Sequence, residues 1–513
     1  MSLLAFDIGS SCCKAALFSV TGEILGQGVR SYVPDFPRPS FVEMDPKKFW
    51  DAVCQVSRAL ADAAGRDAVE ALSISSHAES FVPVSASEAP VGPAILNIDN
   101  RASAEAEWLG RELGKRRLFD VTGLVVHPMF SIPKILWLRK HQPDVFSAAS
   151  RFLNVTAYVL RRLGLPPYVD YSLASRFLAF DVHRRHWSEE ILSAAGLAAD
   201  RLPIPVPAGT IAGKLGAEAA SQLGVATGTP VVVGGHDQAC GALGVGVISP
   251  GLVADSMGTY ECITAVSDQP KLGDEAFASA LNSYCHVVPG MYLTLAYFPS
   301  GIMVKWFHDL LLQNGGRGGE TKAASGPVEV YAWLESRSPK GPSGLYVMPH
   351  LIGTCNPDFN PRARAAVIGL SADSDSGQIY KGILEGVACE LAQISELVAK
   401  AVGDFRDFHV AGGGSHSPLG LKLRAALTGR RLHVMQCQEA VCLGTAILAG
   451  VAAGVYPSVP AGVEQVVREG AVIEPDLQLA AAYAEYVKQY PLLYCAITKI
   501  REPRKPSGEG ESP

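Results

Sequence analysis

Residues 3–20 read LLAFDIGSSCCKAALFSV, an apolar strand holding one acid, a Gly-Ser-Ser turn, and a second apolar strand. Residues 23–29 predict a third strand, so the chain opens with a β-meander. The design recurs at residues 251–266, GLVADSMGTYECITAV, where an acid and a Met-Gly-Thr turn again separate two apolar strands. Two copies predict two homologous domains with a boundary near residue 248, although two unrelated hairpins with common turn residues would give the same pattern.

The length and composition agree with a two-domain enzyme of the α/β class. The chain has 513 residues, of which 48% are hydrophobic and 18% charged, enough for a large core. The net charge of −6 argues against nucleic acid as a partner, because phosphate neutralisation needs a basic face. No apolar stretch is long enough to span a bilayer, the start is expected to be a strand and not a signal peptide, and the 11 cysteines form no CxxC. We therefore expect a cytoplasmic protein without a membrane partner.

The middle of the chain alternates strand-like and helix-like segments, as an α/β protein does. Residues 377–400 carry apolar side chains at spacings of three and four, which predicts an amphipathic helix. We place the domains at residues 1–247 and 248–500. The tail, REPRKPSGEGESP at 501–513, has no apolar residues and is expected to be disordered.

The motif GGHDQACG at residues 234–241 is the strongest candidate for chemistry. An apolar strand there delivers Asp237 to the sheet edge at which α/β proteins bind ligands, and a helix of small residues follows. Asp237 could equally be the N-cap of that helix. His236 by itself is more often structural than catalytic.

Two turns are candidates for phosphate binding. Asp7 precedes the turn Gly9-Ser10-Ser11 and Lys14, and such turns offer N–H groups and hydroxyls to phosphate while the acid can hold Mg²⁺. Gly258-Thr259 offers the same groups from the second half. A capped hairpin turn is the alternative for each. A third element, AGGGSHSP at residues 411–418, would allow close approach of a purine or a phosphate, or would simply form a tight strand–helix turn.

Taken together and in this order, these motifs resemble the FGGY family of carbohydrate kinases over residues 3–457. The resemblance rests on the motif at 234–241, the two turns and the triple-glycine element, together with PHLIGT at 349–354, AVIGL at 366–370, and ILEG at 383–386. Smaller matches are DP at 45–46, IDNR at 98–101, TG at 122–123 and DYSLASR at 170–176. The resemblance implies two actin-like (ribonuclease H-like) domains with ATP and substrate in the cleft between them. It also implies a homodimer as one expectation, because dimers are common in the family.

The resemblance assigns roles to the motif residues. Asp237 would be the general base, and Asp7 would position Mg²⁺. The residues expected to bind the phosphates and adenine of ATP are Ser10, Ser11, Lys14, Gly258, Thr259, Gly301, Gly413, Gly414 and Ser417. Phosphoryl transfer depends mostly on alignment and charge neutralisation, which suits such a set.

The acceptor is expected to contact His77, Ala78 and Glu79 as well as Asp237. Xylulokinases of this family carry a sugar-binding His where Glu79 stands, whereas glycerol kinases carry a substrate-binding Glu there but an Arg at Ala78. Met129 replaces a substrate-contacting Tyr of glycerol kinases. We therefore expect an acceptor longer than glycerol: a pentulose first, a tetritol, pentitol or other polyol second. An actin-like protein that binds nucleotide without catalysis is the alternative of another class.

Overall fold

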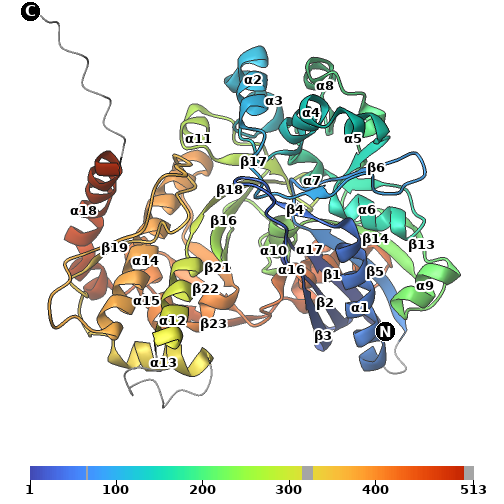
Figure 1. Ribbon diagram of the computed structural model, residues 1–513. Helices are drawn as coiled ribbons and strands as arrows, with labels where there is room; N and C mark the ends of the chain where they lie inside the picture. The colour runs from blue at the N-terminus through green and yellow to red at the C-terminus, as the bar shows by residue number, and fades with distance from the viewer. Residues whose placement is uncertain (65–67, 315–326, 502–513) are drawn as a thin grey trace, which may run out of the picture.

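The computed structural model describes residues 1–64, 68–314 and 327–501, and the predicted disorder of the tail falls almost wholly outside them. Two large sheets form the two halves of the molecule (Figure 1). The first sheet has, in order, β13 (Ile211–Lys214), β14 (Pro230–His236), β5 (Val69–Ser76), β1 (Ser2–Ile8), β2 (Cys12–Ser19) and β3 (Ile24–Ser31). The second has β17 (Asn282–Cys285), β18 (Tyr292–Pro299), β16 (Tyr260–Ser267), β15 (Val253–Met257), β21 (Asp407–Ala411), β22 (Arg431–Met435) and β23 (Glu469–Ile473).

The two sheets share one topology, as the repeated sequence pattern predicted. In the first, β1, β2 and β3 form an antiparallel meander, β5 and β14 add in parallel beside β1, and β13 closes the edge antiparallel. In the second, β15, β16 and β18 form the meander, β21 and β22 add in parallel, and β23 closes antiparallel. The strand β17 is an addition at the outer edge. Strand β1 thus corresponds to β15, and the acidic turn that follows each occupies the same place in its sheet.

Helices cover the sheets, and the first half carries a long insertion. α1 (Pro46–Ala64), α6 (Val155–Arg162) and α9 (Ala217–Leu223) lie with the first sheet. The segment between β5 and β14 adds α2 (Ser103–Leu113), α3 (Lys115–Thr122), α4 (Ser131–His141), α5 (Pro143–Ala148), α7 (Tyr171–Ser175), α8 (Glu189–Ala195) and short strands. These short strands are β6 (Val82–Val84), β7 (Ala94–Ile95), β8 (Arg151–Leu153), β9 (Tyr168–Asp170), β10 (Phe180–Asp181), β11 (His186–Trp187) and β12 (Ile204–Val206). The strand β7 pairs with β4 (Glu43–Met44), which precedes α1.

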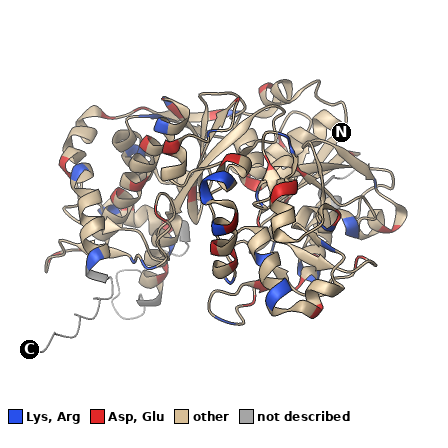
Figure 2. Ribbon diagram, turned by 90° about the horizontal axis from the view of Figure 1, so that it is seen from above, with Lys and Arg blue, Asp and Glu red and all other residues tan. Residues whose placement is uncertain are grey.

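The second half contains further helices. They are α11 (Asp274–Ala278), α12 (Gly301–Asn314), α13 (Pro327–Arg337), α14 (Ser376–Val402), α15 (Pro418–Thr428) and α18 (Leu477–Arg501), with the small sheet of β19 (Tyr346–Met348) and β20 (Ala366–Ile368). The helix α17 (Val459–Val466) instead lies against the turn at Gly22 in the first half. The helix expected at 377–400 is α14. None of the helices in the described ranges is long and apolar enough to cross a membrane. Acidic and basic residues are interspersed over both halves (Figure 2).

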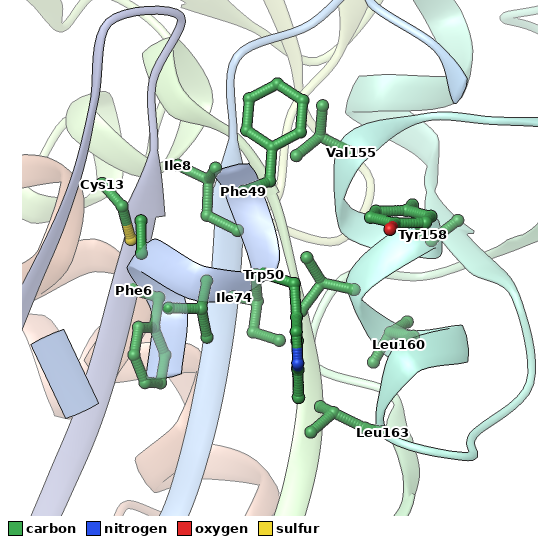
Figure 3. Close-up of a cluster of buried hydrophobic side chains, with 14 of the residues drawn as sticks. Phe6, Ile8, Cys13, Phe49, Trp50, Ile74, Val155, Tyr158, Leu160 and Leu163 are labelled. Carbon is green, nitrogen blue, oxygen red and sulfur yellow. The ribbon is translucent and has the colours of Figure 1, made fainter. Parts of the chain in front are cut away.

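Strand β1 is buried on both faces, and this fixes the position of Asp7. Phe6 and Ile8 point into a core formed with Phe49 and Trp50 of α1 and with side chains of α6 (Figure 3). Because successive side chains of a strand alternate, Asp7 points to the opposite face. Burying each large apolar side chain contributes about 1.5–3 kcal/mol to stability, so strand β1 is held firmly in place.

The opposite face of β1 is covered by α10 (Asp237–Gly244) and α16 (Ala440–Ala452), which cross each other between the two sheets (Figure 1). Their crossing is so close that a Cβ on Gly444 would lie 1.9 Å from the Cys240 carbonyl oxygen, and one on Gly244 1.8 Å from that of Ala440. Only glycine fits at such a backbone contact. A helix from the second half of the chain therefore packs on the first sheet and joins the two halves.

Candidate active site

Asp237 is the first residue of α10, directly after strand β14, as the sequence predicted for this segment. Two glycines bring the strand close to its neighbours: a Cβ on Gly234 would lie 2.3 Å from the Ile74 carbonyl oxygen, and one on Gly235 2.3 Å from a Val287 methyl group. The Asp237 Oδ1 accepts the Gln238 backbone N–H at 2.6 Å. The carboxylate is thereby held at the carboxyl end of the strand, between the two halves.

Asp7 lies near Asp237 at the end of β1, opposite Lys14 on β2 and Ser75 on β5. Burial and the negative charge of Asp237 raise the pKa of Asp7 to about 7. Burial alone would also raise the pKa of Asp237, but His236, followed by smaller contributions from His77 and the Gln238 N–H, outweighs it and lowers that pKa. Two close carboxylates whose pKa values are pushed apart are typical of a catalytic site, and they favour a cation between or beside them.

The first phosphate turn is tied to the second half of the chain through Lys14. Its Nζ lies 2.9 Å from the Glu439 Oε2, and Glu439 directly precedes α16. Burial alone would lower the pKa of Lys14, but the Glu439 carboxylate reverses this and raises it. Within the turn, the Gly9 N–H donates to the Cys12 carbonyl, and Ser10 and Ser11 remain partly or fully exposed. The turn is therefore open to a ligand beside an anchored cation.

The residues expected to bind nucleotide in the second half come together around one turn. A Cβ on Gly301 would lie 2.4 Å from the Gly258 carbonyl oxygen, and the Ile302 N–H donates to the Thr259 carbonyl. A Cβ on Gly414 would lie 2.8 Å from the Met257 Cβ, so the triple-glycine segment lies against the same turn. Gly413 begins the short 3₁₀ helix of that segment. Ser417 caps α15 by accepting the Gly420 N–H at 3.0 Å and donates to Glu335 at 2.5 Å.

On the acceptor side, Glu79 is 5% exposed and takes a left-handed backbone conformation with φ of +60°. Its Oε1 accepts a hydrogen bond from the Arg176 Nε at 2.5 Å, and the Arg176 side chain lies over the Phe130 and Tyr284 rings. A strained backbone at a non-glycine residue is common at functional sites. Glu79 is therefore a buried, paired carboxylate and not an exposed strand-end acid.

His77 and Ala78 lie beside Glu79 but are buried. The His77 Nδ1 bonds to the Ile8 carbonyl and its Nε2 to the Ser80 hydroxyl, both at 2.8 Å. Both ring nitrogens are thus bonded within the protein, and in this geometry His77 joins the Glu79 segment to strand β1. Ala78 is 2% exposed.

Several residues around the acceptor side have no role assigned from the motifs. Arg176 was quoted only as part of a matching motif, and its complete burial as a charged residue depends on a Glu 97 positions away. Tyr297 donates to the Met129 sulfur at 3.6 Å, and Phe359 lies against the His127 ring with centroids 5.3 Å apart. These contacts link the two halves beside the acceptor side. Glu439 carried no signal, because a single Glu before an apolar helix is common.

No cluster of three or more His, Cys, Asp or Glu side chains that could hold a metal occurs in the ranges that the structure describes. A Mg²⁺ that is held by one carboxylate and the phosphates of its nucleotide needs no such cluster. Burial, followed by the negative charge of Asp237, raises the pKa of Asp7, and a divalent cation beside the two carboxylates would offset both effects, so the residues fit such a cation.

Duplicated sheets of this topology, each with an acid in its first strand ahead of a tight turn, define the actin-like class of nucleotide-binding fold. The comparisons with known proteins then give the family. Residues 2–244 match the N-terminal domain, and residues 253–453 the C-terminal domain, of the FGGY family of carbohydrate kinases. The chain belongs to this family and is a carbohydrate kinase, as the motif resemblance predicted.

Relatives within the family differ in the substrate that they are named for. The chain is 28% identical to the xylulose kinase of Escherichia coli K12, covering 96% of this chain and 98% of that protein. It is 30% identical to the autoinducer-2 kinase of Salmonella typhimurium LT2 (96% and 94%) and 27% identical to the gluconokinase of Bacillus subtilis 168 (88% of each). The solved xylulose kinase of Lactobacillus acidophilus has a TM-score of 0.86 at 22% identity, covering 97% of this chain and 98% of that one. This last likeness shows the fold.

Proposed function

We propose that this kinase transfers the γ-phosphoryl group of ATP to a hydroxyl of a small uncharged sugar, with a pentulose of the xylulose type as first choice. The observation that carries the proposal is the Asp237 carboxylate, which is partly exposed at the end of β14 and held ionised beside Asp7. A second carboxylate, the buried Glu79, belongs to the acceptor side described above.

In the proposed reaction, Asp237 accepts the proton of the acceptor hydroxyl as that oxygen attacks the γ-phosphorus. The bond between the γ-phosphorus and the bridging oxygen breaks, and ADP leaves. Ser10, Ser11 and Lys14 would bind the phosphates from one domain and Gly258-Thr259 from the other. Donors that are already oriented towards developing charge contribute most to such a transfer.

The remaining residues would hold the nucleotide and its metal. Gly301 and Gly414 lie against the second turn, and we expect them to border the adenine together with Gly413 and Ser417 of the same triple-glycine segment. Asp7 would hold Mg²⁺, which when bound neutralises charge on the phosphates.

The charges near Glu79 support an uncharged acceptor. Arg176 is already paired with Glu79, so together they contribute no net charge, while Asp237 is ionised. An aldonate such as gluconate would bring a further negative charge close to the ionised Asp237, which is unfavourable at low dielectric. Ketoses and polyols carry no such charge, and the second carboxylate oxygen of Glu79 suits their hydroxyls. A polyol is the second candidate.

The test is ADP release from Mg-ATP with D-xylulose, L-xylulose, D-ribulose, xylitol, erythritol, glycerol, autoinducer-2 and gluconate, followed by mass spectrometry of the phosphorylated product. We expect a neutral five-carbon compound to give the highest kcat/KM. Strong turnover with gluconate would contradict the charge argument. ADP binding without turnover on any acceptor would favour the non-catalytic actin-like alternative.

Asp237→Asn tests the base independently of the substrate. The substitution keeps the shape but removes proton acceptance, so we expect kcat to fall about 10²–10⁴-fold while the KM for ATP stays close to that of the wild type. Unchanged turnover would remove Asp237 from the mechanism.

A further inference from the structure

His236, the last residue of β14, is enclosed between the proposed base and the second domain. Its side chain is about nine-tenths buried, and its Nε2 lies 3.1 Å from the Asp237 Oδ1. Its Nδ1 lies 3.1 Å from the hydroxyl of Tyr284 on β17, a strand of the second sheet. The His236 backbone N–H donates to the Ser172 hydroxyl at 2.9 Å, and this hydroxyl donates to the buried Asp170. The ring is thus contacted at both nitrogens, and the backbone of the residue is held by Ser172.

The hydrogen-bond chain fixes the roles of its donors and acceptors. Burial raises the pKa of Tyr284 far above its ordinary value, so its hydroxyl keeps its proton and can donate to the His236 Nδ1. With Nδ1 accepting from Tyr284, the ring carries a hydrogen on Nε2, which faces the Asp237 Oδ1 at 3.1 Å.

This arrangement divides the two oxygens of Asp237 between two tasks. Oδ1 receives both the Gln238 backbone N–H and the His236 Nε2 hydrogen, which hold the carboxylate in one orientation. Oδ2 accepts no hydrogen bond from the residues that the structure describes, and it is the oxygen left for the acceptor hydroxyl. A base is effective only when it lies within hydrogen-bond reach of the proton that it takes.

We propose that His236 is a positioning residue for the phosphoryl transfer. It orients Asp237 so that Oδ2 faces the acceptor, and it does so through a hydrogen bond to Tyr284 that crosses between the two domains. The inference rests on the proposed function of Asp237 as the general base. It makes the orientation of that base depend on how the second domain sits against the first.

Three variants and one control test this. His236→Leu removes the donor, His236→Gln retains an N–H donor on a side chain of different shape, and Tyr284→Phe removes only the hydroxyl. The control is His286→Leu, another buried histidine, whose Nε2 bonds to the Val247 carbonyl away from the base. For each protein we measure kcat, the KM for ATP and for the acceptor, and the affinity for ADP as a check of folding.

We expect His236→Leu to lower kcat about 10–100-fold, a part of the 10²–10⁴-fold that a general base contributes, with the KM for ATP changed less than about twofold. His236→Gln should restore most of the lost kcat, and Tyr284→Phe should lower kcat severalfold in the same direction. His286→Leu should leave kcat unchanged when it is calculated for the folded fraction, as judged by ADP binding.

The outcomes separate the two proposals. If the wild type turns over and His236→Leu keeps its kcat, the positioning role is overturned while the kinase proposal stands. A His236→Gln variant that is as impaired as His236→Leu, with kcat and ADP affinity falling together, also overturns it and indicates a packing role. A wild type that transfers phosphate to no acceptor overturns both.

Discussion

The close crossing of α10 and α16 predicts how much stability the protein loses when a glycine at the crossing is replaced by alanine. A methyl group on Gly444 would lie 1.9 Å from the Cys240 carbonyl oxygen, whereas ordinary carbon contacts begin near 3.4 Å. Gly444→Ala would therefore force the helices apart by about 1.5 Å, and overpacking of this kind costs about 1–3 kcal/mol or more. The Cys240 carbonyl oxygen belongs to the backbone and cannot move aside as a flexible side chain could. We therefore expect a loss of about 3 kcal/mol in the free energy of unfolding, the upper end of this range.

Gly241→Ala is the matched control within α10. A methyl group there would lie 3.5 Å from a Val441 methyl group, an ordinary contact. Removing a glycine from a helix interior gains about 0.5–1 kcal/mol, so this variant should be neutral or slightly stabilised.

The assay is the thermal unfolding midpoint of both variants, with kcat measured beside it. At about 2–4 °C per kcal/mol for a domain of this size, Gly444→Ala should lower the midpoint by about 6–12 °C. It should also lower kcat, because α10 begins at Asp237 and α16 follows Glu439, the partner of Lys14. Equal midpoints for Gly444→Ala and Gly241→Ala would refute the close packing as the reason for glycine here.

Two further predictions concern buried charges. Burial lowers the pKa of Lys134 from 10.5 to about 7. Between these pH values the unfolded chain binds one more proton than the folded protein, so the free energy of unfolding should increase as the pH rises from 7 towards 10. Lys134→Met should abolish this increase in the urea midpoint, and parallel pH curves for the two proteins would contradict the assignment. Asp99 accepts hydrogen bonds from the side chain of Arg101, which is fully buried and also pairs with Glu43, so Asp99→Asn should cost about 1.5–3 kcal/mol in thermal unfolding. Asp51→Asn, which breaks only an exposed pair with Lys47, should cost under about 1 kcal/mol, and similar losses for both would count against the burial argument.

Much of the fold was determined by local patterns in the sequence. The strand–acid–turn–strand unit at residues 3–20 recurs at 251–266, and the structure contains the two sheets of equal topology that this repeat predicted. Asp7, Asp237 and the triple glycine could be singled out for the same reason. Each stands at the end of an apolar strand, and strand ends in α/β sheets form the ligand-binding edge.

The contacts that complete the candidate site could not be read from the sequence, because they join residues far apart in the chain. Glu79 and Arg176 are 97 positions apart, and Lys14 and Glu439 are 425 apart. Glu79 looked like a strand-end acid until its burial against Arg176 was known, and His236 like a structural histidine until Tyr284 was found opposite its ring. The sequence alone determined the strands, the turns and the family resemblance, since these depend on neighbouring residues. Only the tertiary structure decided which charges are paired and which groups surround Asp237, because both depend on the packing of residues far apart in the chain.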